Sequence, residues 1–175
     1  MYVKRVVITG LGIISPIGNN VETFKNNVMN GICGIDYITH FDTSDFKVKI
    51  AAEVKEFSIT DYIEKSEARR MDIFTQYAMA AAEQAIADSG ISGKVDPHRF
   101  GVYVGSGIGG MDSFINATNK LTKDGPRKVS PLFIPMMISN IASGTIAIKY
   151  EAKGPSLPVV TACATSTNAL GEAFR

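Results

Sequence analysis

The sequence predicts an α/β fold in which a mainly parallel sheet is flanked by helices. Three observations support this class. Strand-like and helix-like segments alternate along the whole chain, as in parallel βα units. The segment Phe100–Val104 is a continuous apolar run, as expected for a strand buried on both faces. Glycines follow two of the predicted strands, at Gly10 and Gly12 and across Gly105–Gly110.

The first half of the chain contains two predicted strands and two predicted helices. The strands are expected at Val3–Thr9 and Val48–Val54, and the helices at Asn20–Met29 and Arg70–Asp88. Asn19 or Asn20 is the candidate N-cap of the first helix, and Gly31 lies just past its end. Gly90 occupies the position of a C-terminal cap after the second helix.

The second half repeats this alternation. Strands are expected at Phe100–Val104 and Val159–Thr161, helices at Met111–Leu121, Met136–Tyr150 and Thr165–Phe174, and a polar loop at Lys123–Ser130. Pro158 cannot donate to a ladder, so it is expected to mark the start of the last strand. Leu170–Arg175 continue a helical pattern without a stop signal, so we expect residues 1–175 to be one domain of a longer, truncated protein.

Composition places the chain among ordinary globular proteins. It has 175 residues, of which 45% are hydrophobic and 20% charged, with a formal net charge of +1. This charge predicts neither a nucleic-acid nor a membrane partner. The first residues lack the apolar stretch of a signal peptide, so we expect a cytoplasmic protein with Cys33 and Cys163 as free thiols. A structural disulfide between them is the alternative.

The segment around Cys163 carries the strongest chemical signal. A predicted strand runs into Cys163, and the small residues Ala164, Thr165 and Ser166 open a helix. The start of a helix carries partial positive charge and unpaired N–H groups, which favour a thiolate and can hold an oxyanion. A nucleophilic cysteine is therefore one interpretation. A buried structural cysteine is the other, because free cysteines are often simply buried.

Four segments resemble the β-ketoacyl synthases, in the order in which that family has them. Lys4–Gly18 (KRVVITGLGIISPIG) resembles their opening strand and turn, and Ala68–Tyr77 (ARRMDIFTQY) the start of their long helix. Val104–Gly110 (VGSGIGG) is similar to their glycine turn, and Gly154–Ser166 (GPSLPVVTACATS) to their active-site segment. The resemblance spans nearly the whole chain and is closest to the synthase II branch of bacterial type II fatty-acid synthesis.

The resemblance implies the N-terminal half of a thiolase-like α-β-α-β-α sandwich, with the C-terminal half absent. In this family the cysteine matched by Cys163 accepts an acyl group from acyl-carrier protein as a thioester. Malonyl-carrier protein then loses carbon dioxide and condenses with that thioester. The family's two catalytic histidines and its lysine lie in the second half, while His40 and His98 match no family motif. We therefore expect this 175-residue chain to be inactive alone.

The resemblance also assigns binding residues. Ile108 matches the far end of the acyl pocket, and Phe133 and Ile134 match a segment that reaches towards the partner subunit in a homodimer. Two basic clusters lie near family positions that contact the acidic acyl-carrier protein, in its acyl and malonyl forms. These clusters contain Lys65, Arg69 and Arg70 in one case and Arg127 and Lys128 in the other. Ordinary core packing and a solvated surface are the alternative interpretations. The resemblance implies no cofactor and no metal.

Two other classes of function remain open. Residues 105–110 fit the pattern G-x-G-x-x-G after a strand and before a helix, which also occurs in NAD(P)-binding oxidoreductases, with Asp124 as the candidate ribose ligand. The third class is a non-catalytic homologue of the condensing enzymes. Such homologues characteristically lack the nucleophilic cysteine, whereas Cys163 is present.

Overall fold

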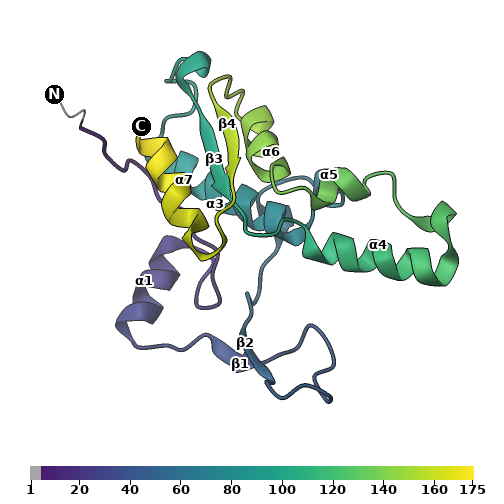
Figure 1. Ribbon diagram of the computed structural model, residues 1–175. Helices are drawn as coiled ribbons and strands as arrows, with labels where there is room; N and C mark the ends of the chain where they lie inside the picture. The colour runs from purple at the N-terminus through teal and green to yellow at the C-terminus, as the bar shows by residue number, and fades with distance from the viewer. Residues whose placement is uncertain (1–4) are drawn as a thin grey trace.

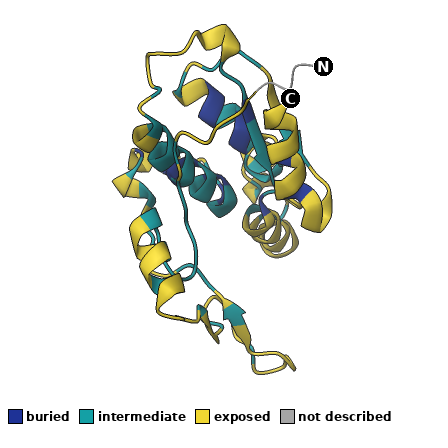
Figure 2. Ribbon diagram, turned by 90° about the vertical axis from the view of Figure 1, so that its left-hand side faces the viewer, coloured by how far each residue is buried: buried dark blue, intermediate teal, exposed yellow. Residues whose placement is uncertain are grey.

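Two parallel strands form the centre of the molecule. In the computed structural model, which describes residues 5–175, β3 (Val102–Gly105) pairs with β4 (Ser156–Val159), so that Gly105 lies opposite Val159. Helix α7 (Thr165–Phe174) packs against one face of this sheet and α6 (Ile141–Lys149) against the other, with α3 (Ile73–Ser89) behind α6 (Figures 1 and 2). The predicted α/β class, with parallel strands flanked by helices, is confirmed.

The core lies between α3, α6 and the sheet. Met79 is the largest fully buried side chain, and it packs in a cluster with Val102 of β3 and Ile146 of α6. Ala142 and Ser143 on α6 are also buried, and their small side chains let this helix pack closely. The sheet and its helices therefore hold the carboxyl ends of β3 and β4 at one edge of the body.

The predicted N-terminal strand is not present over residues 5–9, and residues 3 and 4 lie outside the described part of the chain. Residues 10–13 instead lie against α3. Leu11 donates its backbone N–H to Asp88 Oδ2 at 2.9 Å, and Ile13 donates to Gln84 Oε1 at 3.1 Å. Gly12 has no room for a side chain, since a Cβ there would lie 1.9 Å from the Ala81 carbonyl oxygen. β-Branched residues favour a strand, but the glycines bring this segment onto a helix.

The other elements surround this body. They are α1 (Val21–Met29), β1 (Ile35–Tyr37), β2 (Ile50–Ala52), α2 (Lys65–Ala68), α4 (Met111–Asp124), α5 (Phe133–Met137) and 3-10 turns at Ile59–Asp61, Pro97–Arg99, Pro126–Lys128 and Ala162–Ala164. Two predicted caps are confirmed. Asn20 Oδ1 accepts the Thr23 N–H at 2.8 Å, and Gly90 ends α3 in the left-handed conformation with φ +61°.

Several predicted boundaries are wrong. The helix expected from Arg70 begins at Ile73, and the strand expected over Val48–Val54 covers only Ile50–Ala52. The last strand ends at Val159 and contains Pro158, whereas it was expected over Val159–Thr161. Proline is tolerated in a strand where its missing N–H faces no partner strand. The helix expected over Met136–Tyr150 is broken, because Ile138 is extended and separates α5 from α6. The loop expected from Lys123 begins later, since α4 continues to Asp124.

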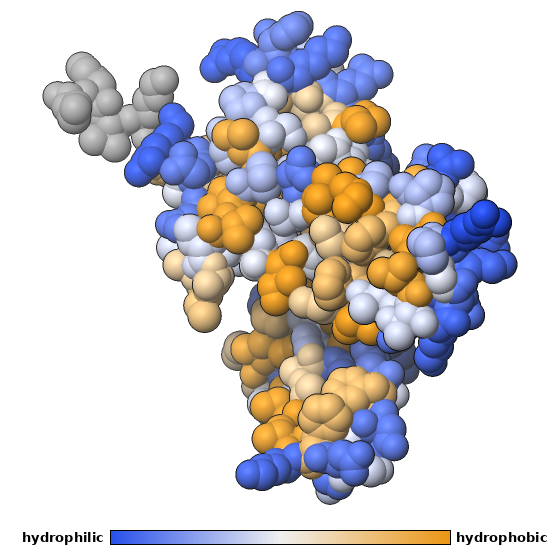
Figure 3. All heavy atoms as spheres, turned by 45° about the vertical axis from the view of Figure 1, so that its right-hand side comes forward, coloured by the Kyte–Doolittle hydropathy of each residue, from blue (hydrophilic) through white to orange (hydrophobic). Residues whose placement is uncertain are grey.

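An arm formed by β1 and β2 projects from the body (Figure 1). Its short antiparallel ladder pairs Ile35 with Ala52 and Tyr37 with Ile50. Lys55 and Asp36 form an ion pair at 2.9 Å, and this contact lowers the pKa of the Asp36 carboxyl. Apolar side chains are exposed on the arm as well as on the body (Figure 3). Tyr37, for example, is 72% exposed.

Candidate active site

Cys163 lies in the short connection between β4 and α7. β4 ends at Val159, a 3-10 turn covers Ala162–Ala164, and α7 begins at Thr165. The thiol is free and exposed. The predicted junction of strand, cysteine and helix is therefore present, and the interpretation as a buried structural cysteine is wrong. Cys33 is also free and exposed, so it is the junction and not exposure that distinguishes Cys163.

The backbone just before the thiol is held in an unfavourable conformation. Ala162 has φ +49°, in the left-handed region that residues other than glycine rarely adopt. Such a conformation costs on the order of 1–2 kcal/mol and persists only where the surroundings enforce it. The small side chain of Ala162 limits the steric clash. The thiol is thus presented by a turn that its neighbours must hold in place.

Thr165 holds this turn from the first position of α7. Its side chain is 5% exposed, and Oγ1 accepts the backbone N–H of Thr161 at 2.8 Å across the turn. Asn168 strengthens the same point by donating from Nδ2 to Thr161 Oγ1 at 2.8 Å. Ala164 offers no side-chain cap to α7. No side-chain atom of Ala164 therefore competes with a substrate oxygen for the backbone N–H groups in the first turn of this helix.

We predict that Thr165→Val slows acylation of Cys163 about 10-fold or more while the protein stays folded. Valine keeps the size of the side chain but leaves the Thr161 N–H without its partner, which costs about 1–3 kcal/mol in a buried setting. The rate is measured by quenched-flow acylation with acyl-carrier protein. Thr122→Val is the matched control, because its hydroxyl donates to the Thr118 carbonyl on exposed α4. An equal loss in both variants would contradict the prediction.

The glycine turn begins beside the cysteine turn. A Cβ at Gly105 would lie 2.5 Å from Thr165 Cγ2, so the end of β3 directly touches the start of α7. Further along, the Gly110 N–H donates to the Met137 carbonyl at 2.8 Å, and Gly109 has φ +86°. A Cβ on Gly109 would lie 2.3 Å from that same carbonyl. The glycines are therefore required for contacts within the protein.

This geometry does not favour the dinucleotide interpretation. A pyrophosphate would need the free N–H groups at the start of α4. The Ser113 N–H in that first turn is instead bonded to the carboxylate of Asp72 at 2.7 Å, which places negative charge where the phosphates would bind. Asp124 lies at the opposite end of α4, about 20 Å along a helix of this length.

An apolar pocket adjoins the glycine turn. Its volume is about 260 Å³, and it is lined by Ile108, Gly110, Met111, Phe114, Met137 and Ile138. These groups suit a hydrocarbon chain and offer no charged side chain. Ile108 is 71% exposed, so its side chain stands at the open rim of the pocket. The structure thus brings Ile108 to a lipid-compatible pocket on the turn that follows Gly105.

Phe133 and Ile134 lie on α5 and have different surroundings. The Phe133 ring packs against Phe114, with a centroid distance of 6.4 Å, and lines a second pocket of about 460 Å³ with Lys120 and Met136. Phe114 lines the pocket beside Ile108 and contacts Phe133 of the second pocket, so its ring lies between the two pockets. Ile134 is 52% exposed and lines neither of these pockets.

The predicted carrier-binding residues lie at the surface. Lys65 begins α2, Arg69 follows it, and Arg127 and Lys128 lie in the 3-10 turn after α4. All four are exposed, and none has an ion-pair partner among residues 5–175. Arg70 is exposed too, and it forms no ion pair with Asp72.

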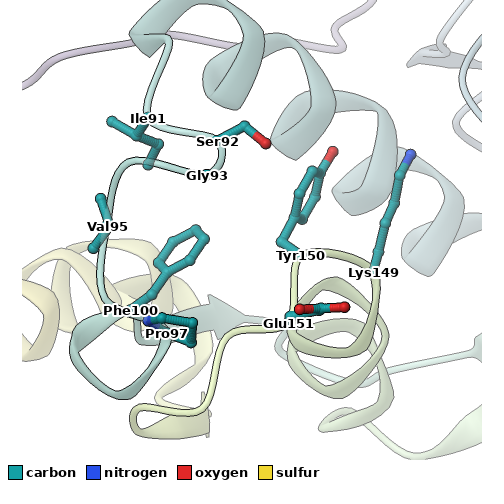
Figure 4. A pocket seen from close by; sticks show the side chains of 9 residues that line it. All are labelled: Ile91, Ser92, Gly93, Val95, Pro97, Phe100, Lys149, Tyr150 and Glu151. Atoms are coloured by element: carbon teal, nitrogen blue, oxygen red, sulfur yellow. The ribbon is translucent and has the colours of Figure 1, made fainter.

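A separate pocket lies at the opposite edge of the sheet, where β3 and β4 begin (Figure 4). Lys149 and Tyr150 line it and both donate to the Glu83 carboxylate. Burial alone would raise the Glu83 pKa, but these hydrogen bonds outweigh it and lower that pKa. Burial raises the pKa of Tyr150 far above its usual range, and the hydrogen bond to the negatively charged Glu83 raises it further. His98 is exposed near this edge, and His40 lies on the arm, so neither is near Cys163.

The sequence analysis missed several groups that hold the cysteine turn and the glycine turn in place. They are Thr165, Asp72 and the main-chain carbonyls of Met136 and Met137. Thr165 had a local signal, because a threonine four residues after Thr161 can close a turn through its hydroxyl. Asp72 and the carbonyls had none, since they act across long separations in the chain.

Comparison with known proteins identifies the family of this chain. Residues 3–175 match the family described as the beta-ketoacyl synthase N-terminal domain. The chain belongs to the β-ketoacyl synthase family. Its relatives include 3-oxoacyl-(acyl-carrier-protein) synthase 2 of Staphylococcus aureus strain COL, which is 52% identical over 173 residues. That match covers 98% of this chain and 42% of the relative, so the chain spans about two fifths of its relatives' length.

Solved β-ketoacyl synthase structures share the fold. The ishigamide ketosynthase/chain length factor superposes with a TM-score of 0.84 at 28% identity, over 96% of this chain and 43% of that one. A ketosynthase bound to a hexaketide, in complex with its type II PKS acyl-carrier protein, gives a TM-score of 0.81 at 26% identity over 95% of this chain and 44% of that one. The predicted N-terminal half of a thiolase-like fold is confirmed. No helix in residues 5–175 has the length and apolarity needed to cross a membrane.

Proposed function

We propose that the full-length protein carrying this chain is a β-ketoacyl-acyl-carrier-protein synthase II, an acyltransferase of fatty-acid elongation. Residues 1–175 are its N-terminal domain. The observation that carries the proposal is the exposed thiol of Cys163 at the junction of β4 and α7, next to the glycine turn that lines an apolar pocket. The relatives that match almost all of this chain, named 3-oxoacyl-(acyl-carrier-protein) synthase 2, support the same activity.

The proposed chemistry has two covalent steps. The Cys163 thiolate attacks the thioester of an acyl-carrier protein, and the carrier's thiol leaves as the new thioester forms on Cys163. Malonyl-carrier protein then loses carbon dioxide, and the resulting carbanion attacks the thioester carbonyl. A carbon–carbon bond forms, the carbon–sulfur bond breaks, and the thiolate of Cys163 is regenerated. The reaction as proposed needs no organic cofactor and no metal.

Within this chain, the parts of the site have separate tasks. The first turn of α7 directs backbone N–H groups towards the side of the sheet where Cys163 lies, and such groups stabilise a developing oxyanion. Ile108 and the apolar pocket beside it accept the acyl chain, and Phe133 and Ile134 extend this surface towards a second subunit in a homodimer. A cytoplasmic location fits the two free thiols.

Product formation tests the proposal. We expect the full-length protein to convert acyl- and malonyl-carrier protein into a β-ketoacyl-carrier protein two carbons longer, detected by mass spectrometry with release of carbon dioxide. An acylated Cys163 that is never elongated would indicate a different acyltransferase. Absence of any covalent acyl group on Cys163 would refute the proposal.

The two basic clusters are proposed to bind acidic acyl-carrier protein. We predict that the double change Arg127→Glu and Lys128→Glu weakens carrier binding about 10-fold and reduces its dependence on salt, because opposite charges steer such encounters. Binding is measured by fluorescence anisotropy at two ionic strengths. Lys25→Glu with Lys94→Glu is the control of equal charge change, since both residues are exposed and lie outside the clusters. Equal weakening by both pairs would mean that only net charge matters.

A further inference from the structure

Asp72 is a buried carboxylate that joins two helices. Its side chain is 4% exposed. One oxygen, Oδ1, accepts the Phe74 N–H at 3.4 Å and so caps α3. The other, Oδ2, accepts the Ser113 N–H at 2.7 Å in the first turn of α4. The bond to α4 is the shorter and stronger of the two.

No cation forms an ion pair with this carboxylate in the described part of the chain. The starts of α3 and α4, which carry partial positive charge, provide the favourable electrostatic partner instead. The protein therefore buries a charge at the point where these two helices begin. Such a burial is costly unless its hydrogen bonds are kept, so the bonds to both helices fix the geometry.

The carboxylate also lies against the glycine turn. A Cβ on Gly110 would come within 2.9 Å of both Cγ and Oδ2 of Asp72. On its other side the same glycine meets the Met136 carbonyl, at 2.3 Å from such a Cβ. The turn that carries Ile108 is thus held between Asp72 and the end of α5.

The bend between α2 and α3, just before Asp72, is held by Gln76. Gln76 Nε2 donates to the carbonyls of Ala68 and Met71, at 3.2 and 3.1 Å, which fixes the bend between α2 and α3. Arg69, in the proposed carrier-binding cluster, lies three residues before Asp72.

We propose that Asp72 is a positioning residue that sets acyl chain-length selectivity, by fixing the Gly105–Gly110 turn through its bond to the Ser113 N–H. This inference rests on the proposed synthase function. Ile108 stands at the rim of the apolar pocket, and its position depends on that turn. Where the turn is fixed, Ile108 has a defined position at the rim, and the pocket that it borders distinguishes acyl chains by length. Where the bond to α4 is lost, Ile108 moves and this discrimination changes.

Two substitutions separate this role from simple capping of α3. Asp72→Ser keeps a good N-cap for α3, since serine reaches the Phe74 N–H, but it is too short to reach Ser113. Asp72→Asn keeps an oxygen of the right length, and we expect that oxygen to face Ser113 because this bond is the shorter one. Its amide group then gives up the weaker bond to Phe74. Asn20→Ala is the control, because it removes an N-cap far from the glycine turn.

The experiment measures kcat/KM of the full-length protein for hexanoyl- and dodecanoyl-carrier protein. We expect Asp72→Ser to change the ratio of these two values at least about 5-fold. Contacts with a few methylene groups are enough to produce a discrimination of this size. Asp72→Asn and Asn20→Ala should leave the ratio within about twofold of the parent value. An unchanged ratio in Asp72→Ser, or an equal change in Asp72→Asn, would overturn the proposal.

Amide hydrogen exchange supplies a measurement that does not require activity. In Asp72→Ser the amides of residues 106–113 should exchange at least about 10-fold faster, and in Asp72→Asn they should not. Equal exchange in the two variants would also overturn the proposal. If the unmodified protein forms no thioester on Cys163, the proposed function fails, and the exchange result still decides whether Asp72 fixes the turn.

Discussion

Cys163→Ser lowers acyl transfer by at least about 1,000-fold, since removing a catalytic nucleophile typically costs this much or more. A serine hydroxyl has the same shape as the thiol but is not ionised near neutral pH, and nothing at the turn offers a base from within this chain. The described side chains that bond to the turn are Thr165 and Asn168, and neither can accept a proton at this pH. Intact-protein mass spectrometry after incubation with acyl-carrier protein measures the covalent adduct.

Cys33→Ser is the matched control for this experiment. Cys33 is the other free and exposed cysteine, but it lies in the connection between α1 and β1 and not at the start of a helix. We expect Cys33→Ser to acylate at the parent rate. An adduct that survives in Cys163→Ser, or that disappears in Cys33→Ser, would place the nucleophile elsewhere. Carrier-protein binding should be equal in both variants, which separates loss of chemistry from loss of docking.

Gly12→Ala destabilises the fold by about 3 kcal/mol, at the upper end of what overpacking costs. The new methyl group would lie 1.9 Å from the Ala81 carbonyl oxygen and 2.9 Å from the Ala85 nitrogen, both in the backbone of α3. Either α3 moves away from the core or residues 10–13 leave α3 and lose their hydrogen bonds to Gln84 and Asp88. Urea unfolding followed by circular dichroism gives the change in free energy.

Gly144→Ala is the control for this substitution. Gly144 lies within α6, and nothing is within 4 Å of the position that its Cβ would take. Alanine is the better helix former by about 0.8–1.0 kcal/mol, so we expect a small gain in stability. If Gly12→Ala proves no less stable than Gly144→Ala, the close packing of the N-terminal segment on α3 is not important for folding.

The sequence was sufficient wherever the determining signal is local. Helix α7 has the predicted bounds Thr165–Phe174, and α3 ends at Gly90 because glycine readily takes the left-handed conformation found there. Cys163 could be identified because strand, small residues and helix follow one another along the chain. A pattern made of consecutive residues does not depend on which distant segments pack against it.

Features that depend on distant contacts could not be predicted. Residues 5–9 have the composition of a strand, but the segment that follows them is held by α3, as in the bond between Leu11 and Asp88, which spans 77 residues. Asp72 was expected inside the helix predicted over Arg70–Asp88, and its bond to Ser113 spans 41 residues. The break in the helix at Ile138 also involves a distant contact, because the neighbouring Met137 carbonyl accepts the Gly110 N–H. Its nearest sequence signal is the pair Ser139–Asn140, residues that disfavour helix interiors.

The contact between Gly105 and Thr165 has a consequence for redesign of this enzyme family. It joins the turn that presents the sulfur to the turn that carries Ile108, and the methyl group and carbonyl of Thr165 lie so close to Gly105 that little space is left to absorb a shift. A substitution chosen to admit a longer or branched substrate therefore reaches the reactive centre through two backbones in direct contact. Engineered selectivity at this turn should come with altered turnover, and compensating changes are best sought in the first residues of α7.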